Sequence, residues 1–99
     1  MTLEKAPALT EAQLQRQVIE YAKILRWRVY HPFLSKWSEK GFPDLTLVRG
    51  DRLVFAELKR ENGKVSDTQV EWLDLLSDTC AEVYVWRPSD WDAIAAVLR

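Results

Sequence analysis

The sequence has little of what holds very small or secreted proteins together. Cys80 is the only cysteine in 99 residues, which excludes an intramolecular disulfide and a zinc site built from several thiolates. With 3 Gly and 4 Pro the composition is not fibrous or low-complexity, and 47% hydrophobic residues suffice for one core. We therefore expect a single folded domain over residues 1–99, with residues 1–9 mobile.

The sequence also lacks long hydrophobic runs. The longest unbroken apolar run is Ala93–Leu98, which is too short to span a bilayer, and Met1–Lys5 has no apolar signal core. We expect a protein that is neither exported nor membrane-spanning. Its natural compartment is then the reducing cytoplasm, which also fits the lone cysteine.

Net charge is close to zero, with 14 Lys and Arg against 15 Asp and Glu. The charges are unevenly distributed, since residues 1–65 carry 12 basic and 8 acidic side chains and residues 66–99 carry 2 basic and 7 acidic. The first part of the chain is thus the part that could meet a polyanion. An ordinary difference in charge between helices and strands is the alternative interpretation.

Capping residues predict three helices. Thr10–Gln13 has the form of a capping box and precedes apolar residues at helical spacing, which predicts a helix up to Arg26; these residues are Leu14, Val18, Ala22 and Leu25. Ser66–Gln69 is a second capping box and predicts a helix to about Thr79, with an apolar stripe of Trp72, Leu73, Leu76 and Cys80. Pro88–Asp90 predicts the start of a terminal helix that reaches Leu98.

Four runs of β-branched and aromatic residues predict strands. Trp27–His31 predicts a short strand that enters a long loop, and Glu82–Arg87 predicts a buried strand. Between them, Asp44–Arg49 and Arg52–Lys59 flank Gly50-Asp51 and predict a hairpin with a two-residue turn. The expected order is αβββαβα, an α/β fold with a central mixed sheet and flanking helices.

The predicted hairpin brings charged side chains together. Its register pairs Arg49 with Arg52 and, extended outward, places Asp44 opposite Glu57, with Lys59 on the same face. Opposed carboxylates need a compensating cation, which is either Lys59 alone or a divalent metal. The alternative is that Asp44 caps a turn and that Glu57 and Lys59 are solvated. Against this, Glu57 and Lys59 lie in an otherwise apolar run, where an unpaired charge is costly.

These residues resemble a known nuclease family. Gly41-Phe42-Pro43-Asp44-Leu45, the hairpin, Phe55-Ala56-Glu57-Leu58-Lys59 and Ser66-Asp67-Thr68-Gln69 together resemble the VRR-NUC family of the PD-(D/E)xK nuclease superfamily, over about residues 11–87. The resemblance implies a protein with a nuclease fold that hydrolyses DNA phosphodiester bonds and uses Mg²⁺ or Mn²⁺. It also implies that the substrate is branched DNA, such as a four-way (Holliday) junction, and that the protein acts in DNA repair.

The resemblance assigns roles to individual residues. It implies that Asp44, Glu57 and the carbonyl of Leu58 are oxygen ligands of the metal, as hard cations prefer. Lys59 would orient or activate the attacking water and neutralise charge on the phosphate in the transition state.

Two further residues are ambiguous. Family members carry an acid on the first helix, and helical-wheel positions place Glu11, but not Glu20, on the side of the apolar stripe, which favours Glu11 as a metal ligand and catalytic residue. A first-turn acid that favours the helix dipole is the other interpretation of Glu11. Gln69 fits position N3 of a capping box as well as a catalytic role.

DNA contacts would come from the basic, loop-rich part of the chain. The DNA-binding candidates are Arg28, Lys36, Trp37, Lys40, Arg60 and Lys64, with Trp37 as a possible stacking platform. His31 would be structural or contact DNA. We expect a homodimer, because each small protomer has one site and one site cuts one strand. We expect this dimer to act in a bacterial or phage-infected cell. The alternative function is a non-catalytic DNA-binding or interaction module that retains the nuclease fold.

Overall fold

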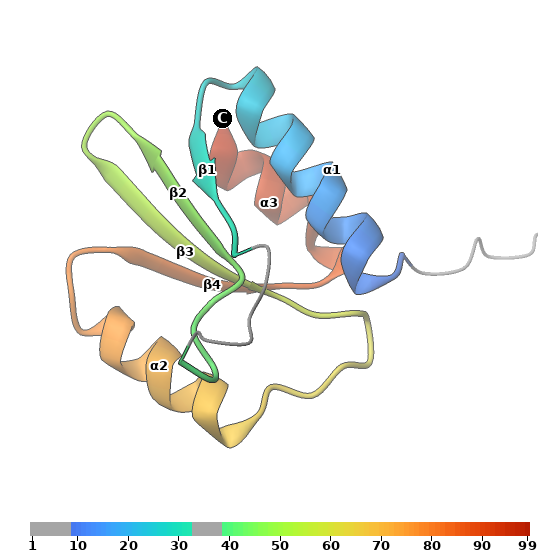
Figure 1. Ribbon diagram of the computed structural model, residues 1–99. Coiled ribbons are helices and arrows are strands. Elements are labelled where there is room, and N and C mark those ends of the chain that lie inside the picture. The colour runs from blue at the N-terminus through green and yellow to red at the C-terminus, as the bar shows by residue number, and fades with distance from the viewer. Residues whose placement is uncertain (1–8, 33–38) are drawn as a thin grey trace, which may run out of the picture.

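The computed structural model describes residues 9–32 and 39–99 and shows a mixed sheet with helices on both faces (Figure 1). The predicted order αβββαβα is confirmed, with a short 3₁₀ turn before the last helix. The elements are α1 (Glu11–Ile24), β1 (Arg28–Tyr30), β2 (Leu45–Arg49), β3 (Arg52–Leu58), α2 (Asp67–Ser77), β4 (Glu82–Trp86), η1 (Pro88–Asp90) and α3 (Trp91–Leu98). In these residues, no helix has both the length and the apolarity to cross a membrane.

The sheet has the strand order β1-β2-β3-β4. β1 pairs antiparallel with β2, and β2 pairs antiparallel with β3. The chain then passes through α2 and returns as β4, which pairs parallel with β3. The predicted hairpin register is confirmed from Arg49↔Arg52 to Leu45↔Ala56. Gly50 has φ +62°, which a two-residue hairpin turn requires and glycine adopts without strain. β3 is therefore a central strand with a neighbour on each side.

The core lies between the sheet and the pair α1 and α3, which cover one face together, while α2 lies against the opposite face (Figure 1). Side chains alternate along the strands, so every second residue of β2 and β3 enters this core. Its buried residues are Leu14, Val18, Ala22, Trp27, Leu45, Leu47, Val54, Ala56, Leu58, Trp86, Ile94 and Leu98. The stripe predicted for the first helix is confirmed at its three buried positions.

α1 begins as its capping box predicts, with Thr10 and Gln13 exchanging side-chain and backbone hydrogen bonds. It ends at Ile24, two residues before the predicted end. The chain turns at Arg26, which has φ +71°, and the Trp27 N–H donates to the Ala22 carbonyl at 2.9 Å. This turn directs the chain into β1.

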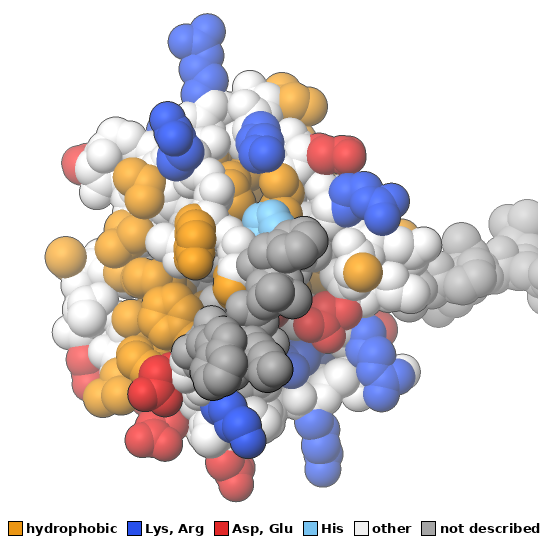
Figure 2. All heavy atoms as spheres, viewed as in Figure 1, with side chains coloured by type: hydrophobic (Ala, Val, Ile, Leu, Met, Phe, Trp, Pro, Cys, Tyr) orange, Lys and Arg blue, Asp and Glu red, His pale blue; other side chains and the backbone are white. Residues whose placement is uncertain are grey.

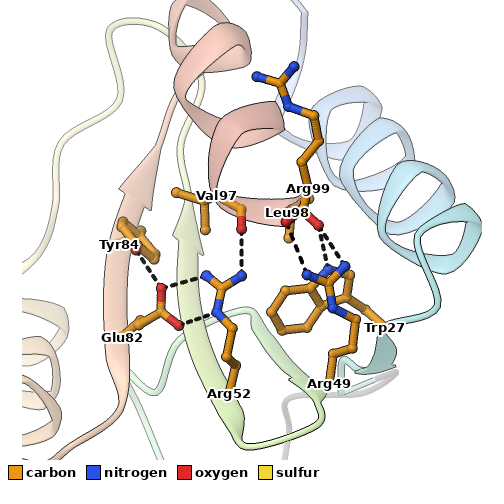
Figure 3. Close-up of polar contacts among 8 residues, drawn as sticks. All are labelled: Trp27, Arg49, Arg52, Glu82, Tyr84, Val97, Leu98 and Arg99. Carbon is orange, nitrogen blue, oxygen red and sulfur yellow. Dashed lines mark hydrogen bonds and ion pairs between the residues drawn. The ribbon is translucent and has the colours of Figure 1, made fainter.

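Two arginines of the hairpin hold the end of α3 (Figure 3). Arg49 donates to the carbonyls of Leu98 and Arg99, at 2.9 and 3.0 Å, and Arg52 donates to the Val97 carbonyl at 2.9 Å. Both guanidinium groups lie over the ring of Trp27, at 4.5 and 5.0 Å from its centroid. The last carbonyls of a helix lack partners within it, so these contacts fix α3 to the turn of the hairpin.

Two expectations about the second half of the chain are wrong. β4 is an edge strand, and of its side chains Trp86 is buried whereas Glu82, Val83, Tyr84 and Val85 are half-buried. α2 ends at Ser77, so Cys80 lies beyond the helix and is exposed rather than part of its apolar stripe. All α2 side chains are half-buried or exposed, because this helix covers only part of its sheet face.

Candidate active site

Asp44 lies at the end of the hairpin remote from its turn. The β2–β3 ladder ends at Leu45↔Ala56, so the predicted direct strand pair of Asp44 with Glu57 does not form. Instead, Asp44 bends over the end of β3, and its Oδ2 accepts a hydrogen bond from the Leu58 N–H at 2.8 Å. The side chain thus stays next to Glu57, through a carboxylate–backbone bond rather than through the sheet register.

The segment before Asp44 packs tightly against α2. Gly41 has φ +90°, and a Cβ there would lie 2.5 Å from the backbone oxygen of Thr68. Pro43 is fully buried. A residue without a side chain is therefore required at position 41, and it lets the loop rest on the first turn of α2. This contact joins Asp44 to the beginning of α2.

Glu57 is the one buried charged residue in the described part of the chain, with 1% of its surface exposed. Its pKa is raised to about 9, mainly by burial and then by the neighbouring Asp44 carboxylate, which disfavours a second negative charge. Lys59 lowers this pKa, and the Glu11 charge raises it slightly. Among the residues described, neither carboxylate oxygen of Glu57 has a hydrogen-bond partner.

Lys59 follows directly after β3. Its N–H donates to the Trp86 carbonyl at 3.0 Å, so the pairing with β4 continues one residue past the strand. The side chain is half-buried, and its charge acts on Glu57. Leu58, between the two, is fully buried and lies opposite Trp86 in the sheet register. The central strand thereby holds Glu57 and Lys59 on the side where Asp44 lies.

The chemistry of this set fits a divalent cation. A buried carboxylate without partners is costly, and two neighbouring carboxylates disfavour ionisation of both unless a positive charge joins them. Carboxylate oxygens are the donors that Mg²⁺ and Mn²⁺ prefer. Within residues 9–32 and 39–99 no group of three or more His, Cys, Asp or Glu side chains is close enough to hold a metal ion. A cation would thus rest on two carboxylates, supplemented by backbone oxygen or water.

Glu11 and Glu20 are both exposed and line different grooves. Glu11 is exposed and lines a shallow groove with Arg60, Glu61 and Asn62, near enough to Glu57 to affect its pKa. Glu20 lines another groove, formed by residues of α1 alone. The role of Glu11 as a metal ligand stays a prediction.

Gln69 performs the capping role that its position predicts. Its Oε1 accepts from the Ser66 N–H at 2.8 Å, and its own N–H donates to Ser66 Oγ at 3.3 Å. A catalytic role for Gln69 stays a prediction.

The segment after Lys59 is tied to the start of η1, which the sequence analysis missed. Arg87 donates to the Gly63 carbonyl at 2.8 Å, and the Ser89 N–H donates to Glu61 at 3.0 Å. These bonds hold the loop that carries Arg60 and Lys64. No sequence signal distinguishes Arg87 and Glu61 from solvated charges, since their partners lie far away in the sequence.

The described DNA-binding candidates are all on the surface, and Figure 2 shows Lys and Arg side chains spread over much of the visible face. Those in the described part of the chain are exposed, namely Arg28, Lys40, Arg60 and Lys64. His31 is half-buried and follows β1. Lys36 and Trp37 lie outside the described residues.

The sequence analysis did not predict a groove that lies beside Asp44. It has a volume of about 660 Å³, and its wall includes Tyr30, Lys40, Phe42, Asp44 and Trp72. The Phe42 ring packs edge-on against Trp72 and Phe55, at centroid distances of 5.1 and 5.7 Å. The signal in the sequence was Phe42 itself, a large apolar residue between the constrained Gly41 and Pro43.

A mixed sheet that presents two carboxylates and a lysine at the end of a central hairpin defines a protein of the nuclease-fold class. The profile of the VRR-NUC domain matches residues 10–90, and the chain belongs to this family. A solved structure described as a VRR_NUC domain is 25% identical, with a TM-score of 0.73 over 89% of this chain and 97% of its own. Another, a VRR_NUC domain protein, is 22% identical, with a TM-score of 0.70 over 92% of this chain and 87% of its own. No curated protein matches the sequence significantly.

Proposed function

We propose that this protein is a divalent-metal-dependent DNA endonuclease that hydrolyses phosphodiester bonds in branched DNA. The observation that carries the proposal is Glu57, a buried carboxyl group whose oxygens lack partners among the described residues, beside Asp44 and Lys59. Burial of such a group costs stability, and a functional site is the usual reason to retain it. Membership of a nuclease-fold family supports the same reaction.

In this proposal Asp44 and Glu57 hold Mg²⁺ or Mn²⁺, with the Leu58 carbonyl as a further oxygen ligand and Glu11 as the acid from α1. When bound, such an ion polarises the phosphate and lowers the pKa of water. The Leu58 N–H contributes by fixing one oxygen of Asp44, which leaves the other free to bind. The burial of Glu57 excludes competing water from its carboxylate.

Lys59 supplies the positive charge for the transition state. Its backbone is fixed to Trp86, and its charge acts on Glu57, so the ammonium group belongs to the same site as the carboxylates. It orients the attacking water and compensates the charge that develops on the phosphate. The Oε1 atom of Gln69 caps α2, so the side-chain amide nitrogen of Gln69 is the group that would contact the substrate.

The proposed substrate is a four-way junction or a similar branched DNA, and the proposed assembly is a homodimer. Each protomer has one pair of carboxylates, so symmetric cuts on two strands need two sites related by a two-fold axis. Arg28, Lys40, Arg60 and Lys64 would contact phosphates, and Lys36 and Trp37 belong to the same proposal. In the same proposal, residues 1–99 form one nuclease domain that acts in the cytoplasm.

A cleavage assay tests the proposal. A four-way junction and a linear duplex of the same arm sequences are incubated with the protein in Mg²⁺, in Mn²⁺ and in EDTA. Cleavage should require the metal and be faster on the junction. Asp44→Ala, Glu57→Ala and Lys59→Ala should each reduce cleavage about a hundredfold or more while junction binding persists, because they remove charge stabilisation from the transition state.

Glu20→Gln is the matched control, because Glu20 lies on α1 away from the site. It should cleave as the unaltered protein does. Cleavage in EDTA, or full activity of any of the three alanine variants, contradicts the mechanism. Junction binding without cleavage in either metal supports the non-catalytic binding module instead. Sedimentation tests the dimer separately.

A further inference from the structure

The groove beside Asp44 has the size and lining of a ligand site. Its volume of about 660 Å³ lies within the range of pockets that hold small molecules. Tyr30 presents a ring that is 66% exposed, and Phe42 is 38% exposed. Figure 2 shows hydrophobic side chains gathered on this face of the molecule, over β2, β3 and α2.

The groove is rigidly built on the side of Phe42. This ring is held edge-on by Phe55 of β3 and Trp72 of α2, so its position is set by both the sheet and the helix. Aromatic pairs of this geometry are favourable, and a ring fixed in advance loses little freedom on binding. Gly41 anchors the same segment on α2. The platform is therefore ready before a ligand arrives.

The groove is continuous with the proposed catalytic site. Asp44 lines the groove and also lies beside Glu57, and Phe42 precedes Asp44 by two residues. A DNA strand whose phosphate reaches Asp44 would therefore pass along the groove with a neighbouring nucleotide. Among the described residues that line the groove, Lys40 is a cation and Glu39 and Asp44 are carboxylates, so net charge does not select a DNA strand as the occupant. The aromatic rings do, because every nucleobase offers a face for stacking.

We propose that this groove binds one unpaired nucleobase of the DNA, next to the phosphate that is cleaved. The inference rests on the proposed function and specifies its substrate: a base inside a continuous duplex is stacked between its neighbours and cannot enter, whereas a base at a branch point or strand end can. Preference for branched DNA then follows because stacking is interrupted at a branch point, so a base there leaves its pair more readily than in a continuous duplex, in addition to any symmetry of the assembly.

The test uses a forked duplex with two unpaired arms, in EDTA so that it stays intact. One unpaired nucleotide at a time is replaced by an abasic site, and binding is measured by fluorescence anisotropy. At one position near the fork, loss of the base should weaken binding at least about fivefold, the lower end of what one base–aromatic stack contributes. At that position, 2-aminopurine should lose fluorescence on binding, as stacking requires.

Tyr30→Thr removes the exposed ring while keeping a residue suited to a strand. It should weaken binding of the intact fork by a similar factor, and the abasic substitution should then cost nothing more, because the two changes remove the same contact. Leu53→Thr is the matched control: it removes a side chain of 39% exposure from a strand of the same sheet, outside the groove. It should bind both forks as the unaltered protein does.

Different failures give different results. Independent effects of the Tyr30 and abasic changes, or no effect of any abasic site, overturn the groove inference while metal-dependent cleavage still stands. Dissociation of a dimer by both Tyr30→Thr and Leu53→Thr, with unchanged dependence on the base, makes this face a contact between two copies and overturns it too. Absence of DNA binding and of cleavage defeats the proposed function itself.

Discussion

Replacement of Glu57 by Gln should make the metal-free protein more stable at neutral pH. The raised pKa means that Glu57 takes up a proton when the chain folds, since its value is 4.5 as a free group and about 9 in the folded protein. Between these two values the folded state binds more protons than the unfolded state, so the free energy of unfolding falls as pH rises. Gln has the same shape, needs no proton and can donate an N–H to Asp44.

The size of the gain in stability depends on how far the working pH lies above 4.5, the pKa of Glu57 in the unfolded chain. Each unit between 4.5 and the working pH costs about 1.4 kcal/mol, so at pH 7 the penalty removed by the substitution is about 3 kcal/mol. At pH 5 the same calculation gives less than about 1 kcal/mol. The gain should therefore be large at neutral pH and nearly absent in mild acid.

Urea unfolding in EDTA at pH 5 and pH 7 measures both values, with Glu20→Gln as a control that should change neither. Addition of Mg²⁺ should then raise the stability of the unaltered protein and have much less effect on Glu57→Gln, since a ligand stabilises the state that binds it. A variant that is less stable than the unaltered protein at pH 7 in EDTA refutes the reasoning. It would mean that the Glu57 carboxylate is already satisfied in the fold.

The remaining predictions concern two matched pairs. Gly41→Ala should destabilise the fold by more than about 2 kcal/mol in thermal or urea unfolding and lower cleavage, because it adds a clash with α2 to the strain at φ +90°. Gly50→Ala has free space around its Cβ and should cost about 1 kcal/mol, from the strain alone; equal costs would contradict the packing argument. Glu11→Gln should reduce metal-dependent cleavage at least about tenfold and Glu20→Gln should not, and the reverse result would assign the acid of α1 to Glu20.

Much of the fold could be predicted from the sequence because its signals are local. Both capping boxes involve residues three apart, and the register of the hairpin follows from its two-residue turn. The exposure of β4 could not be predicted in this way. Val83 and Tyr84 suit a buried strand, and their half-buried state depends on β4 being at the edge of the sheet, which the tertiary arrangement decides.

The candidate site was predicted in part for the same reason. The alternation of side chains correctly put Glu57 beside Asp44, but the hydrogen bond from Leu58 that holds Asp44 replaces the expected strand pair. The groove lined by Tyr30, Phe42 and Trp72 combines three distant segments, so no spacing in the sequence announces it.

β3 pairs with one strand that is close in the sequence and one that is distant, and this difference predicts the order in which the site forms. The hairpin with β2 closes through a two-residue turn, whereas pairs such as Val54 and Glu82 require closure of a long loop through α2. We expect the hairpin to form first, which brings Asp44 to Glu57 before β4 docks and fixes Lys59 through Trp86. Substitutions in the hairpin should then slow folding, whereas substitutions in β4 should mainly accelerate unfolding. The two carboxyl groups thus meet early and the backbone bond that fixes Lys59 forms late, so the site is complete only when β4 has docked.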